Sequence, residues 1–238
     1  MNFDEMFLAK ATAAGIIITQ EQLNSFSIYF DNLVQTNKNV NLTAIVEAED
    51  VAVKHFIDSL SVYDDKYFSA TAKVCDVGTG AGFPGLPLKI WKPNLQVMLM
   101  DSLAKRLKFL DDTIELLKLN GIETCHIRAE DAGRSKLHRE MYDVLLARAV
   151  APLNILSEYC LPLVKVGGVF AAMKAKQTEE ELKQAGLAIK LLGAKIEEVK
   201  KVQLPDLDDE RAVIYLRKIK ATPAIYPRKA GLPEKKPL

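Results

Sequence analysis

A glycine-rich segment is the part of this sequence best suited to chemistry. Residues 74–85 read VCDVGTGAGFPG, in which Gly78, Gly80 and Gly82 permit tight turns and close approach of a ligand to the main chain. A strand-like run precedes the segment and a helix-like pattern follows it, as a nucleotide-binding loop requires. The spacing of the glycines also fits the dinucleotide pattern GxGxxG. The glycines alone therefore leave two cofactors open, NAD and S-adenosylmethionine (SAM).

Acidic residues near the ends of the predicted strands favour SAM. Asp76 lies just before the first glycine, where a carboxylate suits the ammonium group of SAM better than a pyrophosphate. Asp101 follows the second strand about 20 residues later, where an acid accepts hydrogen bonds from the ribose of either cofactor. Ala129 and Glu130 follow the third strand, where a backbone N–H or a carboxylate can bind the adenine edge. We expect SAM as the cofactor and S-adenosylhomocysteine as its product.

Alternating strand-like and helix-like segments must position these residues. Short apolar runs at 74–77, 97–100, 124–128, 144–147 and 168–174 alternate with helix-like segments at 84–92, 103–119, 153–164 and 178–192. This alternation predicts βαβ units and a parallel sheet. The last two runs, 195–204 and 211–219, have no helix between them and predict an antiparallel hairpin. We therefore expect an α/β fold of the Rossmann-like class I SAM-dependent methyltransferase type, with a mostly parallel seven-stranded sheet.

The segments on either side of this predicted core differ from it. Residues 1–72 carry apolar residues at helical spacing, with Thr19 as a predicted N-cap and a break in the pattern at 37–43, so we expect an N-terminal helical extension. The methyltransferase core then spans 73–220. Residues 221–238 form a basic, proline-rich tail, which we expect to be extended and partly flexible. The chain has a formal net charge of +1, so this basic end suggests a local contact with a polyanion.

Composition excludes several other classes of protein. The three cysteines, Cys75, Cys125 and Cys160, have no CxxC spacing, so we expect neither a disulfide framework nor a metal site. No apolar run approaches the roughly 20 residues needed to cross a bilayer, and the first residues, MNFDE, carry no basic signal region. We expect a soluble, cytoplasmic protein with no membrane partner, and nothing in the sequence requires more than a monomer.

Several motifs, in order, resemble the RsmG (GidB) family of bacterial methyltransferases of small-subunit ribosomal RNA. The matching segments are NLTAI (41–45), KHFIDSL (54–60), CDVGTGAGFPGLPL (75–88), DSLAKR (101–106), RAED (128–131), ARAVAPL (147–153) and TPAIYPRKAGLPEKKP (222–237). The resemblance implies SAM-dependent methylation of N7 of one guanosine in 16S rRNA, in a loop near the decoding centre of the small ribosomal subunit. It also implies cofactor contacts at Gly78, Phe83, Ala129, Glu130 and Arg148.

This chemistry agrees with the residues present. Guanine N7 carries an in-plane lone pair and no proton, so its methylation needs alignment rather than a general base. The fourth strand is followed by Arg148 and not by the Asn/Asp-Pro-Pro-aromatic motif of exocyclic-amine methyltransferases. We expect Arg148 to position cofactor or substrate.

Basic and aromatic residues elsewhere are candidates for the RNA surface. These are Lys54 and His55 in the KHFIDSL segment, where Asp58 could pair with Lys54, and Tyr226, Arg228 and Lys229 in the tail.

The residues leave two alternative functions open. One is a NAD-dependent oxidoreductase, although no Tyr-x-x-x-Lys pair is evident. The other is a ribosome-associated protein that retains SAM without turnover.

Overall fold

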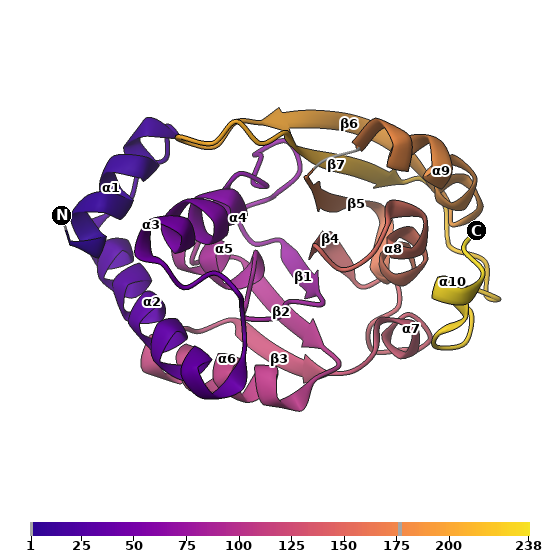
Figure 1. The fold of residues 1–238 in the computed structure, drawn as a ribbon. Helices are drawn as coiled ribbons and strands as arrows, with labels where there is room; N and C mark the ends of the chain where they lie inside the picture. The colour runs from indigo at the N-terminus through magenta and orange to yellow at the C-terminus, as the bar shows by residue number, and fades with distance from the viewer. Residues whose placement is uncertain (1, 176–177) are drawn as a thin grey trace.

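Seven strands form one sheet in the computed structural model, which describes residues 2–175 and 178–238 (Figure 1). The strands are β1 (Lys73–Val77), β2 (Gln96–Asp101), β3 (Ile122–His126), β4 (Tyr142–Arg148), β5 (Val164–Lys174), β6 (Ala194–Val202) and β7 (Arg211–Lys218). Their order in the sheet is β3–β2–β1–β4–β5–β7–β6. The first five strands pair in parallel, whereas β7 pairs antiparallel with both β5 and β6. The predicted parallel sheet and terminal hairpin are confirmed.

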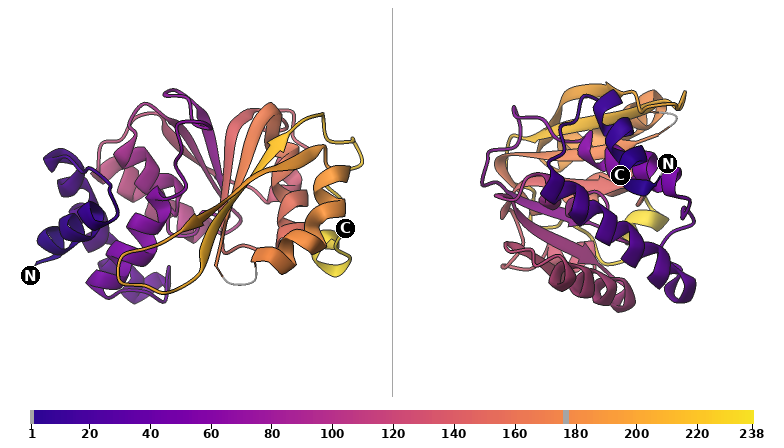
Figure 2. Two further views of the ribbon diagram at one scale, coloured as in Figure 1. Left: turned by 90° about the horizontal axis from the view of Figure 1, so that it is seen from above. Right: turned by 90° about the vertical axis from the view of Figure 1, so that its left-hand side faces the viewer.

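Helices cover both faces of the sheet, so its central strands are buried on both sides. Residues 144–147 of β4 are fully buried, which explains why this strand reads as a continuous apolar run. Alternate residues enter two separate cores, with Val144 and Leu146 in one and Leu145 and Ala147 in the other. Figure 2 (left) shows the sheet between these two helical layers.

The predicted helices between the strands are also present. One face carries α5 (Gly85–Trp91) and α6 (Ala104–Leu116), and the other carries α7 (Ala129–Ala132), α8 (Leu153–Cys160), η2 (Leu161–Leu163) and α9 (Thr178–Leu191). Each parallel connection leaves the carboxyl end of a strand and returns through a helix, so the loops after β1, β2, β3 and β4 share one edge of the sheet.

The N-terminal extension packs on the face that carries α5 and α6. It comprises α1 (Phe3–Ala13), α2 (Gln20–Val40), α3 (Ala48–Asp50), the π-helical segment η1 (Val51–Ile57) and α4 (Asp58–Leu60). Thr19 caps α2 as predicted, in a capping box with Gln22. The helix continues to Val40, three residues beyond the start of the predicted break, and ends at Asn41 in a left-handed conformation. Phe7, Phe26 and Phe56 are fully buried and belong to the same core as the sheet, so the extension shares that core.

The C-terminal tail packs against the core, which corrects the expectation of an extended and flexible segment. It includes the short helix α10 (Leu232–Lys235) and lies beside α7 and α8 (Figure 1). The Arg139 guanidinium donates to the backbone oxygens of Thr222, Pro223 and Tyr226, and Arg134 donates to that of Pro227. The proline and basic residues of the tail had led us to expect disorder. The arginines that bind the tail lie more than 80 positions earlier in the chain, so the sequence of the tail gives no local signal of these contacts.

Candidate functional site

The glycine loop between β1 and α5 has the backbone conformation that its sequence predicted. Gly78, Gly80 and Gly82 all have positive φ, at 70°, 61° and 103°. A Cβ on Gly82 would lie 2.7 Å from the Tyr29 hydroxyl oxygen, and Tyr29 itself donates a hydrogen bond to the backbone oxygen of Ala81. The N-terminal extension therefore holds the loop from behind, and Gly82 is required for packing as well as for its backbone angle.

Asp76 supports the glycine loop from beneath and is fully buried. One carboxylate oxygen accepts hydrogen bonds from the Thr79 hydroxyl at 2.7 Å and the Gly85 N–H at 2.9 Å. The other oxygen is buried and has no hydrogen-bond partner among the described residues. Burial raises the pKa of Asp76 to about 6, although the two hydrogen bonds oppose the shift. Asp76 therefore fixes the start of α5, and its expected contact with the cofactor ammonium group stays a prediction.

A cavity of about 320 Å³ opens at the carboxyl ends of β1, β2, β3 and β4, and we call it the glycine-loop cavity. Its wall includes Gly78, Asp101, Ala129 and Glu130, all of which were expected to bind the cofactor. Asp101 is 3% exposed, and its carboxylate accepts hydrogen bonds from the backbone N–H groups of Gly80 at 3.0 Å and Leu103 at 2.9 Å. The structure thus brings together residues from three strand ends, as predicted. Other lining residues are Met100, Arg106, Tyr159, Val150, Gly231 and Glu234.

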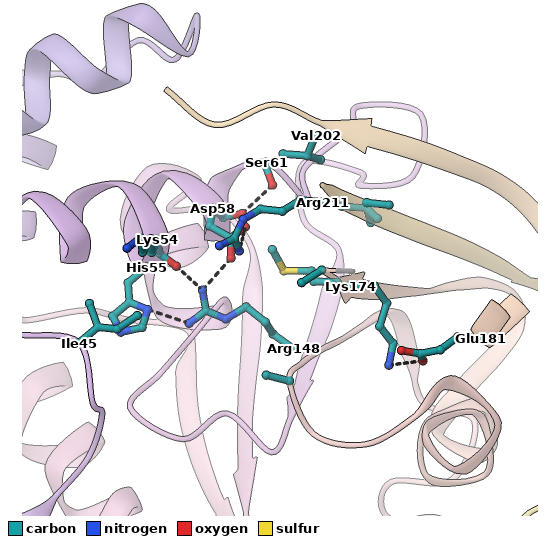
Figure 3. Close-up of a pocket in the computed structure, with 15 residues that line it drawn as sticks. Ile45, Lys54, His55, Asp58, Ser61, Arg148, Lys174, Glu181, Val202 and Arg211 are labelled. Atoms are coloured by element: carbon teal, nitrogen blue, oxygen red, sulfur yellow. Dashed lines mark hydrogen bonds and ion pairs between the residues drawn. The ribbon is translucent and has the colours of Figure 1, made fainter. Parts of the chain in front are cut away.

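A second cavity, of about 400 Å³, lies between the carboxyl end of β4 and the N-terminal extension (Figure 3), and we call it the arginine cavity. Arg148 lies on its wall and donates to the Lys54 backbone oxygen at 3.0 Å and to the Asp58 carboxylate at 2.9 Å. Arg148 also donates to His55 Nδ1 at 3.2 Å. Arg211, at the start of β7, donates to the other Asp58 oxygen at 3.2 Å. A single buried carboxylate therefore fixes two guanidinium groups.

Two features of this cluster differ from the sequence predictions. Lys54 pairs with Asp50 at 2.8 Å and not with Asp58. Lys54 lies within the π-helical segment η1 and Asp58 follows that segment directly, so the two side chains are not spaced as in an α-helix. Asp58 is 4% exposed and lies beneath Arg148. Arg211 was not among the predicted residues because it follows Asp208, Asp209 and Glu210, where a solvent-exposed ion pair is the ordinary interpretation. Arg211 Nε is buried and has no acceptor among the described residues, a property that only the fold reveals.

His55 lines the arginine cavity and positions Arg148, while its expected contact with RNA stays a prediction. Since an arginine N–H can only donate, His55 Nδ1 accepts from Arg148, and the proton resides on Nε2, which donates to the Thr43 hydroxyl at 2.9 Å. The imidazole is 7% exposed and stacks on Phe83 with 4.4 Å between ring centroids. Burial, followed by the neighbouring Arg148 charge, lowers the pKa of His55 to about 3, so the ring is neutral.

Phe83 links the glycine loop to this cluster. The Arg148 guanidinium carbon lies 5.0 Å from the centre of the Phe83 ring, in a cation–π contact. Phe83 is 5% exposed. Among the described residues, neither cavity wall includes Phe83, Asp76, Gly80 or Gly82. These residues support the wall from behind.

The two cavities meet at Ala149, which lines both. Its φ of 55° is unusual for a residue other than glycine and costs roughly 1–2 kcal/mol. Strain of this kind persists where the surrounding structure enforces it, commonly at functional sites. Ala149 is thus the residue at which the two cavities adjoin. Neither His55 nor Asp58 is placed as a general base, since their acceptor atoms are occupied by guanidinium groups.

The RNA candidates in the tail are only partly exposed. The Arg228 guanidinium is bound to the Glu158 carboxylate, whose side chain is 1% exposed, so its charge is neutralised within the protein, and contact of Arg228 with RNA stays a prediction. The half-buried Tyr226 packs against the core that contains α8 and α9. Lys229 is exposed, and Lys54 lies on the wall of the arginine cavity.

No three His, Cys, Asp or Glu side chains within 2–175 and 178–238 are grouped so that they could hold a metal ion. None of the helices described in the structure combines the length and the apolar character that a membrane span requires.

Solved structures share the fold. The chain matches the structure of Pyrococcus horikoshii TYW2 in complex with MeSAdo, with a TM-score of 0.55 and 17% identity over 70% of this chain and 63% of that one. The structure of M. jannaschii TYW2 in complex with AdoMet matches with a TM-score of 0.51 and 17% identity over 69% of this chain and 76% of that one. At these identities the likeness establishes the class I methyltransferase fold.

Sequence relatives establish the family. The family model described as rRNA small subunit methyltransferase G matches residues 22–213. A protein named ribosomal RNA small subunit methyltransferase G from Desulforamulus reducens is 49% identical over 93% of this chain and 92% of the relative. One of the same name from Alkaliphilus oremlandii is 48% identical over the full length of both. The chain therefore belongs to the rRNA small subunit methyltransferase G family.

Proposed function

We propose that this protein transfers a methyl group from SAM to N7 of a guanosine in 16S rRNA, in a loop near the decoding centre of the small subunit. One observation carries the proposal beyond family membership. The glycine-loop cavity and the arginine cavity share Ala149 in their walls, and the two side chains beside Arg148 that could act as a base, His55 and Asp58, have their acceptor atoms bound by guanidinium groups. That arrangement suits a nucleophile without a proton to lose, such as guanine N7.

The glycine-loop cavity fits the proposed cofactor. Its volume of about 320 Å³ lies within the roughly 300–1,000 Å³ of small-ligand sites. Asp101 would accept hydrogen bonds from the ribose, and Ala129 with Glu130 would contact the adenine. Gly78 allows the main chain to approach the ligand closely. When bound, SAM supplies an electrophilic methyl group on a sulfonium.

Arg148 is the residue we assign to positioning. An arginine carries five N–H donors. Three of those in Arg148 are used by Lys54, His55 and Asp58, which leaves two without a partner among the described residues. Because the bound groups hold the guanidinium in one orientation, the remaining donors are pre-oriented toward a ligand. Alignment of this kind is worth effective molarities of roughly 10⁵–10⁸ M in well-oriented systems.

The RNA substrate has two requirements. A paired A-form helix hides N7 in its narrow major groove, so we propose that the target guanine is exposed or turned out of the helix. Lys54 beside the arginine cavity and Lys229 in the tail are the proposed phosphate contacts, which makes RNA affinity salt-dependent. The proposal includes a monomeric enzyme that works in the cytoplasm, where ribosomal subunits assemble.

Reconstitution tests the proposal. Purified protein, SAM and small ribosomal subunits from a strain that lacks this gene should yield N7-methylguanosine in 16S rRNA, detected by nucleoside mass spectrometry. Titration calorimetry should show binding of SAM and not of NAD. Absence of the modified nucleoside, or binding of NAD alone, would reject the proposed function.

A further inference from the structure

The C-terminal tail contributes directly to the wall of the glycine-loop cavity. Gly231 and Glu234 line that cavity together with Asp101 and Glu130, although more than 100 positions separate Gly231 from Glu130 in the chain. We infer that residues 226–234 are a cofactor-binding element that closes and orients the adenosine end of the site. This inference rests on the proposed binding of SAM, and it gives this part of the tail a role toward the cofactor beside the RNA contact proposed for Lys229.

A buried ion pair anchors this element on the core. Arg228 donates through Nε to Glu158 at 2.9 and 3.1 Å, through Nη2 at 2.6 Å and through its backbone N–H at 2.7 Å. Bidentate pairing of this kind fixes orientation as well as position. Pro227 lies close against α7, since a Cβ on Gly133 would be 2.8 Å from the Pro227 ring. The segment that precedes Gly231 is thus held by side-chain and backbone contacts on both α7 and α8.

The anchored segment then contacts the acidic residue expected to face adenine. The Gly231 N–H donates to one Glu130 oxygen at 3.0 Å, and Glu130 is 6% exposed. Gly231 has a φ of 77°, a conformation that glycine adopts without strain. Because this hydrogen bond holds one oxygen, the orientation of the carboxylate and the position of its second oxygen are set by the tail.

A second contact from the tail acts on the same wall. Tyr159, which also lines the cavity, donates from its hydroxyl to Glu234 at 3.1 Å. Two side chains of the core that face the cavity, Glu130 and Tyr159, are therefore oriented by residues of the tail. The positive charge of Arg228 is neutralised inside the protein.

Deletion of residues 231–238 tests the inference, because it removes Gly231 and Glu234 but retains Arg228 and Lys229. We expect the Kd for SAM, measured by calorimetry, to rise at least tenfold. The Kd for methylthioadenosine, which lacks the amino-acid part, should rise by the same factor, since the affected contacts lie at the adenosine end. RNA affinity in a filter assay should stay within twofold. The matched control is the double variant Lys235→Ala/Lys236→Ala, which removes the exposed positive charges of the deleted segment and should bind SAM like the intact protein.

Other results would overturn the inference. A truncated protein that binds SAM within twofold of the intact one, or that loses only RNA affinity, would show that the tail is not a cofactor element. Hydrogen exchange on the intact protein covers the case in which the truncation does not fold. SAM should slow exchange of the backbone amides in 229–235, and unchanged exchange in the presence of bound SAM would contradict the inference. If the intact protein fails to bind SAM at all, it is the proposed function that is rejected.

Discussion

Replacing Asp58 with asparagine removes the carboxylate that lies between the guanidinium groups of Arg148 and Arg211. The two contacts are 2.9 and 3.2 Å, and each uses a different carboxylate oxygen. The asparagine side chain has nearly the same shape, but it offers one oxygen acceptor and no charge. The variant therefore leaves two guanidinium groups close together without a compensating charge.

The expected cost follows from the burial of the three side chains. Breaking a buried ion pair by removing one partner costs about 3–5 kcal/mol. The Arg148 and Arg211 side chains are 15% and 19% exposed, and the asparagine retains one acceptor, so we expect the lower end of that range. A loss of about 3 kcal/mol lowers the Tm of a protein of this size by roughly 6–12 °C. Methyl transfer should fall by about 100-fold, because Arg148 loses one of the groups that orient it.

Thermal and urea unfolding, with methyl transfer measured in parallel, check this prediction. The matched control is Asp50→Asn, which removes an exposed partner of Lys54 on the same segment. Exposed pairs of this kind contribute about 0.5 kcal/mol or less, so the control should behave like the wild type. The reasoning would be refuted if Asp58→Asn cost less than about 1 kcal/mol, or if the two variants lost equal stability.

Three further predictions concern the residues around this cluster. Arg148→Ala should reduce methyl transfer by at least about 100-fold in a protein that remains folded by circular dichroism, and normal activity would remove Arg148 from the site. Because the folded pKa of His55 is about 3, below its unfolded value near 6.5, the contribution of His55 to stability is complete above pH 6.5 and falls as the pH decreases toward 3. Urea unfolding of the wild type and His55→Asn should therefore show a smaller difference at pH 5 than at pH 7, and a constant difference would contradict this. Gly82→Ala should lower the free energy of unfolding by more than about 1 kcal/mol and weaken SAM binding, since the φ of Gly82 is 103° and a Cβ would lie 2.7 Å from Tyr29. The control Gly186→Ala, where a Cβ meets open space in α9, should be neutral or stabilising. Equal effects in the two variants would show that the loop tolerates a side chain.

The strands, the glycine loop and the strand-end residues could be predicted because their signals are local. Alternating runs of fixed length give the parallel sheet, and a parallel sheet brings Gly78, Asp101 and Arg148 to one edge regardless of the details of packing. The resemblance to the family added the activity and the expected cofactor contacts at Phe83 and Arg148. These predictions needed no knowledge of long-range contacts.

Partners across the fold could not be predicted in this way. The pairing of Lys54 with Asp58 assumed α-helical geometry, but η1 is π-helical and Asp58 contacts β4 and β7 instead. Arg228 looked like a free cation because its partner, Glu158, lies 70 positions earlier in the chain. His55 looked like a surface residue because the sequence does not show that Phe83 and Thr43 enclose it. In each case a buried charge or ring is matched by a group from another element.

The most direct test of the central claim is to map N7-methylguanosine along 16S rRNA from cells with and without this gene. The claim is that the junction of the two cavities at Ala149 aligns a methyl donor with a guanine N7. We predict one modified position, in a loop near the decoding centre, that disappears on deletion and returns with the wild-type gene but not with the Arg148→Ala variant. A modification pattern that is the same with and without the gene would contradict the account.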